Sequence, residues 1–242
     1  MNKSKLNGKV VLVTGAARRI GRTIALRLAE EGAQLAVHYN TSEKEAAEVA
    51  SQCGGKAFRA DLTKVAEIQQ LFDELQTAYG RLDALVNNAA RFRAMNVLEV
   101  TEKDWDWIHQ VNLRATFFCC QAGAKLMLKT GGGRIVNISS LGGLRPWSKH
   151  VPYGASKAGV IMMTRGLAKA LAPEITVNSV APGVIHFGDE IPPDVQHLID
   201  VTPMRRHGTG EEIADAVLGF LTASSFITGQ LLAVDGGLSL RA

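Results

Sequence analysis

Short runs of valine, isoleucine and leucine alternate along the chain with longer stretches in which apolar residues recur every three to four positions. The short runs are typical of strands buried on both faces, and the longer stretches are typical of helices with one buried face. We expect strands at Val10–Val13, Leu35–Val37, Ala57–Arg59, Leu85–Val86, Ile135–Ile138, Ile175–Val180 and Leu231–Val234. We expect helices at Arg19–Glu31, Ser42–Gln52, Lys64–Tyr79, Lys103–Lys129, Tyr153–Leu171 and Glu211–Thr222.

This alternation indicates right-handed βαβ units, because parallel strands need a crossover that packs back onto the sheet. We therefore predict an α/β fold with a doubly wound parallel sheet of about seven strands and helices on both faces. No linker, repeat or low-complexity tract divides residues 1–242, which favours one domain. Residues 185–207 have the weakest pattern and contain Pro192, Pro193 and Pro203, so this segment is a candidate substrate lid.

The composition excludes several other classes of protein. Hydrophobic residues make up 46% of the chain and charged residues 21%, as in soluble globular proteins. The net charge of +4 comes from dispersed residues, which argues against a nucleic-acid partner. The three cysteines and six histidines lack metal-ligand spacing, so we expect no metal site and a reducing, cytoplasmic location. Residues 216–234 carry no charge but contain polar positions, which favours buried core over a membrane span.

The first predicted strand runs directly into Thr14–Gly21 and then into a helix. Small residues in such a turn let the backbone approach a pyrophosphate, and free N–H groups at the helix start face that anion. Proteins that bind NAD usually place an acid after the second strand to bind the ribose hydroxyls. This chain has Asn40 and Ser42 there, with Arg18 and Arg19 in the neighbouring turn, so NADP(H) is favoured over NAD(H).

Candidate catalytic residues follow the fifth predicted strand, Ile135–Ile138. Ser139 and Ser140 end the strand Ile135–Ile138, and Tyr153 precedes Lys157 by four residues, which places both on one helix face. A phenol with a pKa near ~10 is a weak acid–base catalyst at neutral pH. A nearby ammonium stabilises the phenolate, so we expect Lys157 to lower the pKa of Tyr153.

Together these motifs resemble the short-chain dehydrogenase/reductase family, whose fold is of the Rossmann type. The resemblance extends from Lys9 to Leu238. Its motifs are Thr14–Gly21, Asp61-Leu62, Asn87–Ala90, Asn112, Ser140, Tyr153–Lys157, Pro182-Gly183, Gly229-Gln230 and Asp235–Gly237. The family keeps thirteen positions between its serine and its tyrosine, which selects Ser140 over Ser139.

The resemblance implies specific roles for these positions. Tyr153 would be the general acid/base, Ser140 would orient the substrate carbonyl, and Lys157 would also hold the nicotinamide ribose. Asn112 would anchor a water in the proton relay. The resemblance also implies a homotetramer acting on a small molecule. The predicted cofactor-binding residues are Gly15, Arg18, Arg19, Ile20, Gly21, Asn40, Ser42, Asp61, Leu62, Asn88, Ala89, Tyr153, Lys157, Pro182, Gly183 and Val184.

The chain departs from the family pattern at two positions, since Arg19 and Ala90 replace glycines. Arg19, the His38-Tyr39 pair and Phe92 resemble pteridine reductases, although those enzymes tend to carry aspartate where this chain has Ser140. We therefore expect an NADP(H)-dependent reductase of a carbonyl or a pteridine. The alternatives are a 3-oxoacyl-(acyl-carrier-protein) reductase and a non-catalytic nucleotide-binding sensor. The predicted substrate-binding residues are Arg19, Phe92, Ser140, Trp147 and Tyr153; His150 is a further candidate for lining the pocket.

Overall fold

The apolar runs pair into one seven-stranded sheet in the computed structural model, which describes residues 4–241. The strands lie in the order β3-β2-β1-β4-β5-β6-β7, and every neighbouring pair is parallel. Their bounds are β1 Val10–Val13, β2 Gln34–Tyr39, β3 Lys56–Arg59, β4 Ala84–Asn87, β5 Gly133–Ile138, β6 Ile175–Pro182 and β7 Leu231–Val234. The predicted doubly wound α/β fold is confirmed.

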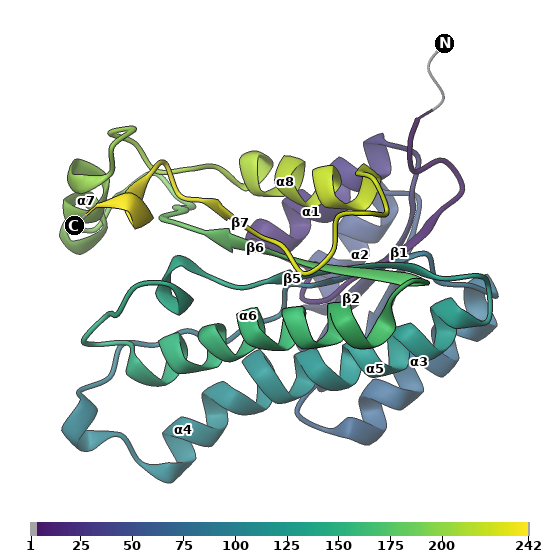
Figure 1. Cartoon of the computed structure of the whole chain (residues 1–242), viewed down its shortest axis with the longest axis horizontal. Coiled ribbons are helices and arrows are strands. Elements are labelled where there is room, and N and C mark those ends of the chain that lie inside the picture. Colours follow the sequence, from purple (N-terminus) through teal and green to yellow (C-terminus); the bar gives the residue numbers. More distant parts are fainter. Residues whose placement is uncertain (1–3, 242) are drawn as a thin grey trace.

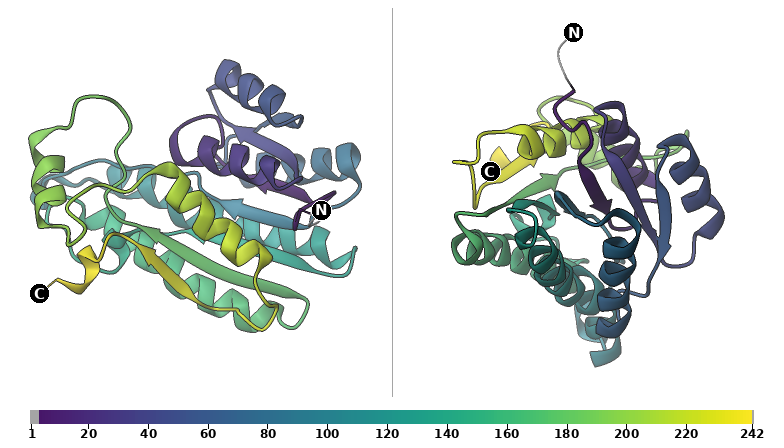
Figure 2. Two further views of the ribbon diagram at one scale, coloured as in Figure 1. Left: turned by 90° about the horizontal axis from the view of Figure 1, so that it is seen from above. Right: turned by 90° about the vertical axis from the view of Figure 1, so that its right-hand side faces the viewer.

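Helices cover both faces of this sheet (Figures 1 and 2). One apolar cluster joins the sheet to α1, α2 and α8, and a second joins it to α3, α5 and α6. The bounds are α1 Arg19–Glu30, α2 Glu43–Gln52, α3 Val65–Tyr79, α4 Glu102–His109, α5 Thr116–Leu128, α6 Val151–Leu171, α7 Pro193–Val201 and α8 Gly210–Thr222. Because the central strands are buried on both faces, they read as continuous apolar runs.

The structure differs from the expected elements in two places. The helix expected at Lys103–Lys129 is divided into α4 and α5 by a π-helical turn at Gln110–Ala115. The segment 185–207 contains the short helix α7, which the weak apolar pattern did not predict. Within residues 4–241, no helix is both long and apolar enough to cross a membrane. The single domain and the lid stay predictions.

Candidate active site

The carboxyl ends of the central strands bring the predicted site residues to one edge of the sheet. β1 is followed by the Thr14–Arg18 turn, β4 by Asn88, β5 by Ser139 and Ser140, and β6 by Gly183. The strand order reverses between β1 and β4, and ligands of such sheets bind in the crevice at this point.

The turn after β1 fits a dinucleotide pyrophosphate. Helix α1 begins after Arg18 with no side-chain cap and no acidic residue in its first turn, so its free N–H groups favour an anion. Gly21 has no room for a side chain, because a Cβ would lie 2.2 Å from the Gly15 carbonyl oxygen. Arg19 has a φ of +50°, a left-handed conformation that costs a non-glycine residue about 1 kcal/mol. Ile20 packs against the core below the turn.

Asn88 holds this turn in place. Its side-chain amide donates to the carbonyl oxygens of Thr14, at 2.9 Å, and Gly15, at 3.1 Å. The Thr14 hydroxyl in turn accepts from the backbone N–H groups of Asn88 and Ala89. The amide of Asn88, predicted to face the ribose, is therefore engaged by the turn itself.

His38 of the adjacent strand β2 supports the same turn, a role that the sequence did not predict. Its Nδ1 accepts a hydrogen bond from the Gly15 N–H at 3.0 Å, and its Nε2 lies 3.1 Å from the Ala60 carbonyl oxygen. This pattern requires the neutral ring with its proton on Nε2. Burial lowers the pKa of His38 to about 4, so the ring is neutral at physiological pH.

The end of β2 carries more charge than the local sequence indicates. Arg18 forms an ion pair with Glu45 of α2, with 2.8 Å between Nε and Oε1. Arg59, at the end of the adjacent strand β3, donates from Nε to the Asn40 carbonyl oxygen at 3.4 Å. Ser42 is the residue before α2. Arg59 and Glu45 therefore contact the group of residues predicted to bind the 2′-phosphate, namely Arg18, Asn40 and Ser42. The contacts Arg18–Glu45 and Arg59–Asn40 join residues that are distant in sequence.

The remaining predicted cofactor residues lie on either side of the turn. The Asp61 carboxylate accepts from the backbone N–H and hydroxyl of Thr63, and Leu62 is buried. Pro182, Gly183 and Val184 continue from β6. Gly183 packs so closely on the chain after β7 that a Cβ would lie 2.6 Å from the Asp235 Cα.

Tyr153, Ser140 and Lys157 meet where α6 crosses the end of β5. The Ser140 hydroxyl is hydrogen-bonded to Tyr153 and accepts from the Gly142 N–H at 3.0 Å. The Lys157 ammonium donates to the Ile138 carbonyl oxygen at 2.8 Å and lies 5.8 Å from the centroid of the Tyr153 ring. The structure thus brings together the three residues predicted to act on a carbonyl.

Burial shifts the pKa values of this group in opposite directions. It raises the pKa of Tyr153, and the hydrogen bond with Ser140 opposes the rise without cancelling it. It lowers the pKa of Lys157 to about 8, because a buried ammonium loses hydration. The net shift of the Tyr153 pKa is upward, and its lowering by Lys157 stays a prediction.

Asn112 lies in the π-helical turn between α4 and α5, and such turns are frequent at functional sites. Its side-chain oxygen accepts from the Arg91 N–H at 2.7 Å, and its amide donates to the Arg91 carbonyl at 2.9 Å and to the Ser156 hydroxyl at 3.1 Å. The side chain therefore clamps the loop after β4. Its water-anchoring role stays a prediction.

Phe92 connects Tyr153 to two further aromatic rings, those of Trp147 and His150. Phe92 contacts Tyr153 edge to face with 4.8 Å between ring centroids, stacks on His150 at 4.6 Å, and lies 6.5 Å from Trp147. Of the predicted substrate residues, Phe92, Trp147, Ser140 and Tyr153 are thus gathered. Arg19 is exposed, and its guanidinium makes no hydrogen bond or ion pair with any residue in the described range 4–241.

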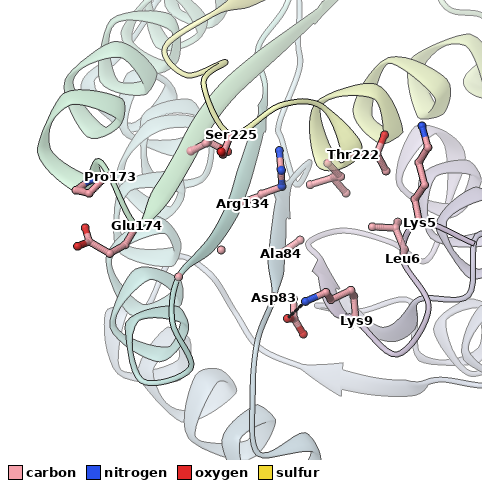
Figure 3. Close-up of a pocket in the computed structure, with 14 residues that line it drawn as sticks. Lys5, Leu6, Lys9, Asp83, Ala84, Arg134, Pro173, Glu174, Thr222 and Ser225 are labelled. Carbon is pink, nitrogen blue, oxygen red and sulfur yellow. Dashed lines mark hydrogen bonds and ion pairs between the residues drawn. The ribbon is translucent and has the colours of Figure 1, made fainter.

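A cavity of about 640 Å³ lies at the opposite edge of the sheet, where β4, β5 and β6 begin (Figure 3). Its half-buried Arg134 donates to the Phe220 carbonyl oxygen at 3.1 Å, near the end of α8. The guanidinium thus satisfies a helix terminus and is distant from the Tyr153 group. Among the described residues, no cluster of three or more His, Cys, Asp or Glu side chains has metal-site geometry.

Comparisons with known proteins agree with this geometry. Residues 15–239 match the family model described as Enoyl-(Acyl carrier protein) reductase. The chain is 38% identical to a 3-oxoacyl-(acyl-carrier-protein) reductase of Synechocystis over 241 residues, covering 96% of this chain and 98% of the relative. It is 41% identical over 251 residues to subunit BbsD of a hydroxy(phenyl)methyl-succinyl-CoA dehydrogenase of Thauera aromatica, covering 98% and 99%.

The fold is also similar to solved structures. A short-chain dehydrogenase/reductase of Serratia marcescens, solved as a double phenylalanine-to-leucine mutant, superimposes with a TM-score of 0.91 at 36% identity. The match covers 97% of this chain and 99% of that one. Because the family model and these relatives extend over nearly the whole chain, this protein belongs to the short-chain dehydrogenase/reductase family of oxidoreductases.

Proposed function

We propose that this protein uses NADPH to reduce the 3-oxo group of an acyl thioester. The observation that carries the proposal is the half-buried phenol of Tyr153, which is hydrogen-bonded to Ser140 and lies beside Lys157 at the carboxyl edge of the sheet. A phenol that is protonated at neutral pH and placed beside the substrate oxygen can act as a general acid that donates its proton to the developing alkoxide. The thioester is supported by the names of the relatives, which include 3-oxoacyl-(acyl-carrier-protein) reductases of Synechocystis and Staphylococcus aureus.

The residues of the site have distinct roles in the reduction. The nicotinamide cofactor supplies a hydride when bound. The hydroxyls of Ser140 and Tyr153 bind the carbonyl oxygen, and Tyr153 donates its proton to that oxygen as negative charge develops there. Lys157 fixes the end of β5 through the Ile138 carbonyl, which keeps Ser140 in register with Tyr153. Thr14, His38 and Asn88 keep the turn at Gly15 open to the pyrophosphate.

A pteridine is the second candidate substrate, because the exposed ring of Phe92 offers a planar face beside Tyr153. The thioester has the stronger support, since the relatives from Synechocystis and Staphylococcus aureus are 3-oxoacyl-(acyl-carrier-protein) reductases and none of the relatives named above is a pteridine reductase. The discriminating experiment follows NADPH absorbance with acetoacetyl-CoA and with a dihydropteridine. Faster turnover of the thioester supports the proposal, and faster turnover of the pteridine overturns it. If neither substrate is turned over but NADPH binds, the non-catalytic sensor is favoured.

The cofactor preference depends on Arg18. We expect Arg18→Ala to weaken NADPH binding at least about tenfold more than NADH binding, because a charge-assisted bond to a phosphate is worth about 1.5–3 kcal/mol. Glu45→Gln should instead tighten NADPH binding about two- to fivefold, since it frees Arg18 and removes a carboxylate from the phosphate site. Dissociation constants from fluorescence titration measure both effects.

The matched control for the charge change is Glu48→Gln, an exposed carboxylate on the same helix. Equal weakening of NADPH and NADH in Arg18→Ala would contradict the NADP(H) assignment. Unchanged NADPH affinity in Glu45→Gln, with the Arg18→Ala effect intact, would contradict only the competition between Glu45 and the 2′-phosphate.

Large apolar side chains are exposed in two regions. Phe226, Leu232 and Leu240 lie on and around the edge strand β7, and Trp105 and Met162 lie on α4 and α6. Large exposed apolar patches often mark association sites, and an uncovered edge strand offers unpaired N–H and C=O groups to a partner. These surfaces are consistent with the homotetramer, which stays a prediction.

A further inference from the structure

Phe92, Trp147 and His150 form an aromatic wall beside the phenol of Tyr153. The Phe92 and His150 rings are parallel within 8°, at 4.6 Å, and Trp147 meets both rings edge to face. Phe92 nevertheless leaves 57% of its surface exposed. One face of the ring is thus covered by His150, and the residue still presents apolar surface to the site.

The wall is held in position before any substrate binds. Both backbone polar groups of Arg91, the residue before Phe92, are bonded to the Asn112 side chain. The Met95 N–H donates to the Lys149 carbonyl oxygen at 2.7 Å, which ties the loop after β4 to the loop that carries Trp147 and His150. A site of this kind binds a ring with a small loss of side-chain entropy.

The position of the wall relative to the catalytic group determines what it contacts. A carbonyl oxygen bonded to Tyr153 and Ser140 places its carbonyl carbon next to the phenol, and the Phe92 centroid lies 4.8 Å from that of Tyr153. A substituent on the carbonyl carbon that extends towards Phe92 would therefore contact its ring. Aromatic pairs gain energy from edge-to-face and offset-stacked contacts beyond area burial, whereas a methyl group gains only the burial.

We propose that the preferred substrate is an aryl ketone, in which an aromatic ring is attached to the carbonyl carbon that is reduced. This inference rests on the proposed function and specifies its substrate as a 3-aryl-3-oxoacyl thioester. Phe92 is its specificity-determining residue, and Trp147 and His150 support the Phe92 ring.

The test compares kcat/KM for 3-oxo-3-phenylpropanoyl-CoA and acetoacetyl-CoA with NADPH. We expect the wild type to favour the phenyl substrate about two- to tenfold, in line with the energy of an aromatic pair. Phe92→Leu should reduce this ratio to about one, mainly through a higher KM for the phenyl substrate, and Phe92→Tyr should preserve the ratio. Leu98→Ala is the control, because Leu98 is 92% exposed on the same loop and outside the wall.

The outcomes separate the two levels of the proposal. A wild-type preference for acetoacetyl-CoA, or a ratio unchanged by Phe92→Leu, overturns the aryl assignment while the thioester reductase stands. Failure to turn over either thioester overturns both. A ratio lost in both Phe92→Leu and Phe92→Tyr also overturns the assignment, since a ring at this position would then not be the determinant.

Discussion

Replacing Tyr153 with phenylalanine is expected to lower kcat by about 10²–10⁴-fold, the usual contribution of a positioned general acid. The ring and its contact with Phe92 are retained, while the hydroxyl that bonds to Ser140 is lost. NADPH binding should change by no more than about tenfold, because the substitution removes at most one neutral hydrogen bond. Steady-state kinetics and fluorescence titration measure the two quantities separately.

The matched control for this substitution is Tyr79→Phe. The Tyr79 hydroxyl donates to the Leu35 carbonyl oxygen at 2.9 Å, on the part of α3 that packs beside β2 and far from Ser140. Its loss should cost about 1 kcal/mol of stability and leave kcat unchanged. Retention of more than about a tenth of the activity in Tyr153→Phe would contradict the assigned role.

Acidification from about pH 7 to about pH 4 should remove about 3 kcal/mol of folding stability through His38 alone. The pKa of the folded protein's His38 is about 4, below its ordinary value of 6.5, because the ring is buried. Between these values the unfolded chain binds a proton that the folded chain does not, so stability falls with falling pH. Protonation at Nδ1 would also break the bond from the Gly15 N–H.

His38→Asn isolates this contribution, because an asparagine oxygen can accept from the Gly15 N–H without titrating. Denaturant unfolding at several pH values should show a shallower loss of stability in the variant than in the wild type over this range. In the wild type, NADPH affinity should decrease as the pH is lowered, and in the variant it should decrease less. Parallel pH profiles for the two proteins would contradict the role of His38.

The sequence by itself determined the architecture. Parallel strands buried on both faces must be nearly continuous apolar runs, and the crossovers between them must be amphipathic helices, so both periods are visible in the residues. The positions of Tyr153 and Lys157 were also predictable, because they share one helix face, whereas Ser140 was selected over Ser139 by its resemblance to the family's serine–tyrosine spacing. Helix α7 was not predictable, since a short helix between loops has a weak periodic pattern.

Only the tertiary structure decided the surroundings of these residues. His38 contacts Gly15 from an adjacent strand, Glu45 reaches Arg18 across 27 positions, and Arg59 meets Asn40 because β2 pairs with β3. Asn88 and Asn112 are bonded to backbone groups, and burial raises the pKa of the Tyr153 phenol. Periodicity reports which face of an element is buried, whereas hydrogen-bond partners and desolvation depend on which distant segments the fold places against that face.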